Sequence, residues 1–115
     1  MVVRSWQEGR STIVEASGEL DMAVAPRLRD ELDRALAIAG RPLLVIDLTA
    51  VPFCDSVGLG VLVSALNRVR GAHGRLILVL GPGMIAHLLT ITNLDRHFEI
   101  CSSANEARAL LGAAA

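Results

Sequence analysis

The chain has 115 residues and a formal net charge of −1, and 52% of its residues are apolar although only 3% are aromatic. This length suits a single domain whose one core is built from aliphatic side chains. Direct nucleic-acid binding is not expected because no basic surplus is present, and membrane insertion is not expected because the apolar stretches are short or broken.

The first half of the chain predicts a hairpin, a helix and a buried strand. Alternating, valine-rich segments at 2–7 and 12–16 flank a turn that contains Gly9. A continuous apolar run at 43–48 is typical of a central strand covered on both faces. The helix between them has an apolar stripe with helical spacing: Leu28, Leu32, Ala35, Leu36 and Ala39.

The second half predicts alternating helices and strands. A helix follows Ser56, with a core stripe of Leu59, Leu62, Val63, Leu66 and Val69. Beyond it we expect a strand at 75–80, a helix at 84–90, a strand at 98–101 and a terminal helix through Leu111. The predicted fold is therefore α/β, a single domain over residues 1–115. It has a mostly parallel sheet of about five strands, an antiparallel N-terminal edge hairpin and about four helices.

The histidines and cysteines show no spacing that suits metal binding or catalysis. A serine nucleophile needs a base within reach, and His73 falls at the far end of the helix that begins at Ser56. Cys54 and Cys101 are interpreted as reduced, packed thiols of a cytoplasmic protein, with a redox-sensitive pair as the alternative. We therefore expect no enzyme activity, no cofactor and no metal.

The most informative segment is residues 45–63, where a buried strand leads through a short loop into Asp55-Ser56 and an apolar helix. A helix N-terminus has unpaired N–H groups and a partial positive charge, so it tolerates anions. One of these two residues can simply cap the helix, or Ser56 can be a phosphorylation switch. Asp21 also follows a strand, so we expect it at the same end of the sheet.

The helix after Ser56 also carries apolar residues outside its core stripe, namely Val57, Val61 and Ala65. Either another layer of the domain covers them, or they form an exposed apolar patch beside Ser56, as protein interfaces often do. The residues expected to contact a partner are Asp21, Asp55, Ser56, Val57, Gly58 and Val61.

Three segments together resemble the STAS domain family, and more narrowly the bacterial anti-sigma factor antagonists. They are Gly18-Glu19-Leu20-Asp21, the strand end Val45-Ile46-Asp47-Leu48, and Asp55-Ser56-Val57-Gly58-Leu59-Gly60. The resemblance covers nearly the whole chain. It implies that Ser56 is the phosphorylated residue and that Asp21 and Asp55 position the partner or support phosphotransfer.

The same resemblance implies a partner-switching function. The unphosphorylated form binds an anti-sigma factor and so releases a sigma factor. That anti-sigma factor is typically also an ATP-dependent serine kinase, which inactivates the antagonist by phosphorylating Ser56, and a PP2C-type phosphatase reverses this. Val57 departs from the family pattern, which often has Ser or Thr there, and this bears on partner choice.

A second interpretation is a STAS subunit of a membrane lipid-transport ATPase complex, in which phosphorylation is not required. Transport versions often carry Thr at the acceptor position, so Ser56 favours the antagonist.

Overall fold

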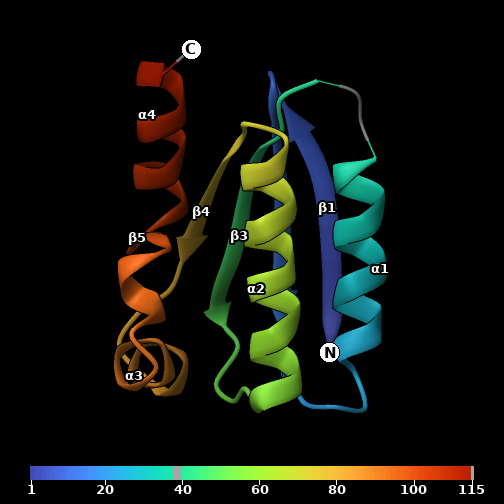
Figure 1. Ribbon diagram of the computed structural model, residues 1–115, viewed down its shortest axis with the longest axis vertical. Coiled ribbons are helices and arrows are strands. Elements are labelled where there is room, and N and C mark those ends of the chain that lie inside the picture. Colours follow the sequence, from blue (N-terminus) through green and yellow to red (C-terminus); the bar gives the residue numbers. More distant parts are fainter. Residues whose placement is uncertain (38–39, 115) are drawn as a thin grey trace.

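The computed structural model describes residues 1–37 and 40–114, which form five strands, four α-helices and one short 3-10 helix (Figure 1). The strands are β1 (Val2–Glu8), β2 (Ser11–Ser17), β3 (Leu43–Ala50), β4 (Arg75–Val79) and β5 (Glu99–Cys101). The helices are α1 (Ala25–Leu36), α2 (Ser56–Gly71), α3 (Met84–Ile91), the 3-10 helix (Leu94–Arg96) and α4 (Ala104–Ala114). The predicted α/β fold is confirmed, although the 3-10 helix was not foreseen. Ala39, assigned to the first helical stripe, lies outside the described residues.

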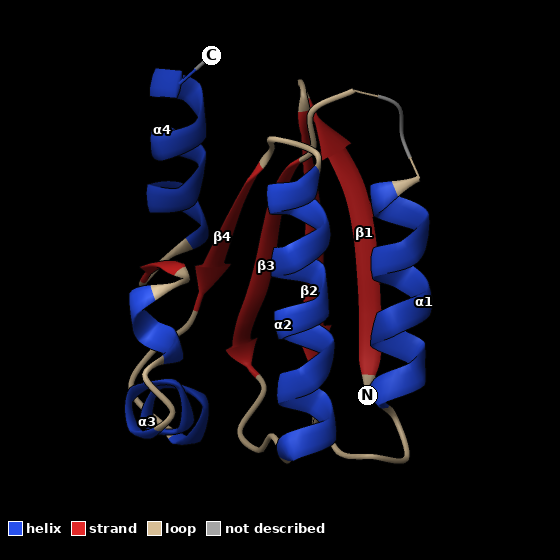
Figure 2. Cartoon of the chain, viewed as in Figure 1, coloured by secondary structure: helices blue, strands red, loops and turns tan. Residues whose placement is uncertain are grey.

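The sheet order is β1-β2-β3-β4-β5, with β1 and β2 antiparallel and the other pairs parallel. Because the sheet grows in one direction, right-handed crossovers place α1 and α2 on the same face. Both helices stand side by side against that face (Figure 2). The core there joins Val14, Ile46 and Leu78 of the sheet to Leu28 and Leu62 of the helices. No helix in the described ranges combines the length and the apolar character that crossing a bilayer requires.

The opposite face of the sheet is covered by α4. Ile13, Val45 and Ile77 alternate along their strands with the residues of the first core, so they point to this second face. There they form a smaller core with Ala107 and Leu111 of α4. Trp6 of β1 packs against the margin of this core.

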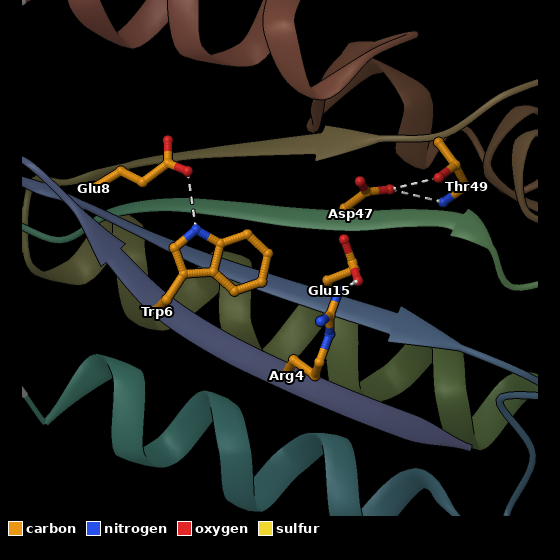
Figure 3. A network of polar contacts seen from close by, with 6 residues as sticks. All are labelled: Arg4, Trp6, Glu8, Glu15, Asp47 and Thr49. Atoms are coloured by element: carbon orange, nitrogen blue, oxygen red, sulfur yellow. Dashed lines mark hydrogen bonds and ion pairs between the residues drawn. The ribbon is translucent and has the colours of Figure 1, made fainter.

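Beside α4 the same face carries polar side chains on β1, β2 and β3 (Figure 3). Arg4 pairs with Glu15 at 2.5 Å, and its guanidinium lies 5.8 Å from the ring centroid of Trp6. Asp47 accepts hydrogen bonds from the N–H and the hydroxyl of Thr49. Asp47 thus interrupts the apolar run of β3 at the edge of the second core, where its carboxylate is only half buried.

The buried surface of α2 is wider than the sequence predicted. Val61 is 2% exposed and Ala65 is 3% exposed, so the hypothesis that they lie on an open face is wrong. Both line the seam between α1 and α2 together with Leu32. The helix packs against α1 as well as the sheet, and this second neighbour buries them, whereas Leu59 and Val63 are only half buried. Val61 therefore contacts the core rather than a partner.

Candidate functional site

The site lies at the carboxyl end of the sheet, where the loops after β2 and β3 bond to each other. The Leu20 N–H donates to the Phe53 carbonyl at 2.8 Å, and the Asp55 N–H donates to the Leu20 carbonyl at 3.2 Å. Leu20 and Cys54 form an isolated parallel bridge. The two strands thus continue their pairing beyond the regular sheet. This brings the loop that holds Asp21 against the start of α2, at the same end of the sheet, as expected from their positions after strands.

Asp55 joins the two loops through its carboxylate. One oxygen accepts the Gly58 N–H at 2.9 Å, which makes Asp55 the N-cap of α2. The other oxygen accepts the Met22 N–H at 2.8 Å from the neighbouring loop. The Gly58 N–H is the main reason that the pKa of Asp55 lies below its ordinary value, with Met22 adding to it. Asp55 is therefore a carboxylate at neutral pH.

Asp21 shapes the turn that leads into α1. Its carboxylate accepts the N–H groups of Ala23 and Val24 at 3.0 and 3.2 Å, and its carbonyl accepts the Ala25 N–H at 2.8 Å. Like Asp55, it is held by backbone amides, as aspartates in tight turns often are. Both carboxylates are thus fixed in position close to the start of α2.

Ser56 is the first residue of α2 and is exposed. The sequence left open whether Asp55 or Ser56 caps the helix, and the structure assigns the cap to Asp55. The Ser56 hydroxyl is therefore not engaged in capping. His73 follows the other end of the same helix, with a left-handed φ of 58°, and is far from a position to activate this hydroxyl. The Ser56 hydroxyl is thus exposed at the start of α2, at the opposite end of the helix from this histidine.

Gly58 allows the first turn of α2 to pack closely against the loop after β2. It is buried, and a Cβ atom there would lie 2.6 Å from the Leu20 carbonyl oxygen and 3.0 Å from the Cys54 sulfur. Only glycine allows this close approach. The expected partner contact at Gly58 is thus contradicted by its burial. The residue instead lets the first turn of α2, which begins at Ser56, pack closely against Leu20 and Cys54.

Exposed apolar side chains occur beside Ser56 in the sequence and in the two loops that bond to each other next to the start of α2. Val57, the neighbour whose exposure the sequence left open, is 42% exposed. Phe53 is 37% exposed, and Met22, whose N–H binds Asp55, is 69% exposed. Sequence reasoning missed Met22 and Phe53, although both are large apolar residues in loops that flank the acidic motif. These four residues, Met22, Phe53, Ser56 and Val57, are called the switch surface below.

The two cysteines lie on opposite faces of the sheet. Cys54 belongs to the core under α1 and α2, and Cys101 belongs to the core under α4. The sheet separates them, so the alternative of a redox pair is wrong. Burial raises the pKa of the Cys54 thiol to about 11, which keeps it protonated and unreactive at neutral pH.

Comparison with known proteins places the chain in a family. Residues 5–107 match the STAS domain, and this chain belongs to the STAS domain family. The anti-sigma-B factor antagonist of Listeria monocytogenes is 34% identical over 84 residues, which cover 73% of each chain.

Two solved structures share the fold. An anti-sigma factor antagonist from Mycobacterium paratuberculosis is 28% identical and covers 95% of this chain and 92% of its own, with a TM-score of 0.85. The Bacillus cell fate determinant SpoIIAA in its phosphorylated form has a TM-score of 0.74, over 96% of this chain and 99% of its own. At 18% identity, this second likeness concerns the fold alone.

Proposed function

We propose that this chain is an anti-sigma factor antagonist that is switched off by phosphorylation of Ser56. The observation that carries the proposal is the position of Ser56. It is an exposed hydroxyl on the first turn of α2, where Asp55 makes the capping bond, and exposed apolar residues flank it in the sequence and in the adjoining loop. The relationship to the Listeria antagonist, at 34% identity, supports the same function.

In this proposal the unphosphorylated switch surface binds a cytoplasmic anti-sigma factor, which then releases its sigma factor. Met22, Phe53 and Val57 contribute apolar area to this contact, as apolar residues do at the centre of protein interfaces. The fixed carboxylates of Asp21 and Asp55 set the orientation of the partner. A PP2C-type phosphatase restores the active form, for which the phosphoserine must be exposed.

Phosphorylation would add a charge of roughly −1.5 to −2 at the centre of this surface. The N–H groups and the dipole of α2 tolerate an anion at that place, so the fold is expected to remain intact. The partner, however, would have to desolvate a doubly charged group beside two carboxylates. Binding is therefore lost without refolding.

The chain supplies only the phosphate acceptor in this scheme. Both nearby carboxylates are already engaged by backbone N–H groups, which leaves them as positioning residues. We assign the nucleotide site and the catalytic base to the anti-sigma factor, acting as an ATP-dependent serine kinase.

The proposal is tested by pull-down from the native lysate with wild-type, Ser56→Ala and Ser56→Glu protein, read by mass spectrometry. We expect wild-type and Ser56→Ala baits to capture the same ATPase kinase, and the Ser56→Glu bait to lose it. Capture of transporter subunits by all three baits would contradict the proposal and favour a subunit of a lipid-transport ATPase complex.

A further inference from the structure

Gly60 is a glycine that the fold itself does not require. It lies inside α2, is exposed, and a Cβ atom built on it would meet nothing within 4 Å. Glycine in a helix interior is less stable than alanine because it loses more backbone freedom on folding. Gly58, only two residues earlier, is different because the Leu20 carbonyl and the Cys54 sulfur exclude any side chain there.

Gly60 lies on the same side of the helix as Ser56. Residues four apart in a helix stand one above the other on one face, and residues three apart are also neighbours. Gly60 is therefore next to both Ser56 and Val57, along the exposed side of α2. The absence of a side chain leaves the backbone bare directly beside the acceptor hydroxyl.

Phosphoryl transfer to Ser56 requires the kinase to approach this part of the helix closely. The Ser56 oxygen must form a bond to the γ-phosphorus of ATP while the bond to the leaving ADP oxygen breaks, and the serine proton passes to a base of the kinase. The reacting atoms must first come to about 3 to 3.5 Å. The serine hydroxyl is only one carbon from the backbone, so the wall of the kinase site must nearly touch the first two turns of α2.

We infer that the active site of the ATP-bound kinase contacts the backbone of α2 at Gly60. A side chain at this position would hold the γ-phosphate of ATP away from the Ser56 hydroxyl. This rests on the proposed function, because the occupant is the kinase that acts on Ser56. A close-fitting contact also means that bulk at Ser56, and not only charge, breaks the complex. Ser56→Gln should then weaken binding nearly as much as Ser56→Glu.

The test compares Gly60→Ala and Gly60→Leu with a matched control, Gly112→Ala. Gly112 is also an exposed helical glycine with open space around it, but it lies on α4. Thermal unfolding is measured first. Binding and the rate of Ser56 phosphorylation are then measured with ATP and the ATPase kinase that the wild-type bait recovers.

We expect Gly60→Ala to raise the unfolding midpoint by a few degrees, and Gly112→Ala, in the last turn of α4, to raise it by less. Only Gly60→Ala should slow phosphorylation, by roughly threefold to tenfold, which corresponds to a small steric penalty. Gly60→Leu should remain folded and lose phosphorylation and binding by more than about tenfold.

Two results would overturn the inference. A lower unfolding midpoint for Gly60→Ala would show that the fold itself requires a glycine at this position. Wild-type phosphorylation of Gly60→Leu would show that no close contact forms there, while the proposed function would still stand if Ser56→Glu loses binding. If Ser56→Glu binds the kinase as well as wild type, the proposed function itself fails.

Discussion

The two ends of the sheet hold their carboxylates in different ways. At the amino end, carboxylates bind arginines on other elements, in the pairs Glu8–Arg108 and Glu99–Arg75. At the carboxyl end, Asp21 and Asp55 bind backbone N–H groups instead. Arginine pairs neutralise charge and tie elements together. Amide-bound carboxylates fix loops instead, so the end that carries Ser56 is shaped by backbone hydrogen bonds.

The largest effect on stability is expected from Val61→Asp, because this substitution disrupts the packing of α2 against α1. The two sets of carboxylates are not involved. Val61 is 2% exposed in the α1–α2 seam, where an aspartate would lose its hydration and replace packed apolar surface, although Arg29 and Arg68 line the outer part of the seam. We expect a loss of stability on the order of 4 kcal/mol, measured by urea unfolding. Val57→Asp, on the exposed side of the same helix, should change stability by less than about 0.5 kcal/mol. Equal behaviour of the two variants would show that the seam is open.

Gly58→Ala tests whether the carboxyl end depends on close backbone packing. The new methyl group would lie 2.6 Å from the Leu20 carbonyl oxygen, so the helix or the loop must move. We expect a cost of about 1 to 3 kcal/mol in urea unfolding. Because the shift moves Ser56, phosphorylation should slow as well. A stabilising effect, as expected for Gly60→Ala, would refute the packing account.

Asp55→Ala removes the bonds that join α2 to the loop after Asp21. The Gly58 and Met22 N–H groups both lose their acceptor, and we expect the thermal midpoint to fall by several degrees. Glu8→Gln at the opposite end should lower the midpoint less, because exposed ion pairs contribute little. A larger effect from Glu8→Gln would reverse the comparison between the two ends.

The smallest effect is expected from pH. The Gly58 N–H lowers the pKa of Asp55 below its ordinary value of 3.8, and Arg108 lowers the pKa of Glu8 from 4.5 to about 2. A folded pKa below the unfolded value stabilises the fold above the unfolded value, and this contribution is lost as the pH falls through the folded pKa. Thermal midpoints should therefore decline from about pH 5 towards pH 2, and less steeply in Asp55→Ala and in Glu8→Gln.

The dependence on salt distinguishes the contribution of Glu8 to stability from that of Asp55. Added salt screens an exposed ion pair more than a hydrogen bond from a backbone amide. The acid-sensitive part that Glu8 contributes should shrink at high ionic strength, whereas the part that Asp55 contributes should persist. Midpoints recorded at low and high salt for both variants check this, and an equal salt response would contradict it.

The sequence predicted the elements well because their signals are local. Alternation defined β1 and β2, and the strand, loop and helix around Asp55 placed Ser56 at a helix start. It failed where distant segments decide the environment. Val61 is buried by α1, Gly58 by the loop at Leu20, and Met22 joins the site through a bond to Asp55 that spans 33 positions. No periodicity within one helix contains this information.

The strand order has a consequence for how the protein is made. Each strand pairs with the one synthesised just before it, so the sheet can grow at one edge as the chain leaves the ribosome. The contacts that shape the switch surface, from Leu20 to Gly58, are complete before β4 exists. Until β4 is made, β3 is paired only with β2, and its other edge exposes unpaired backbone groups on an apolar strand. Such exposed edges favour aggregation. Nascent chains stalled after Gly71 should therefore bind chaperones more strongly than chains released at full length.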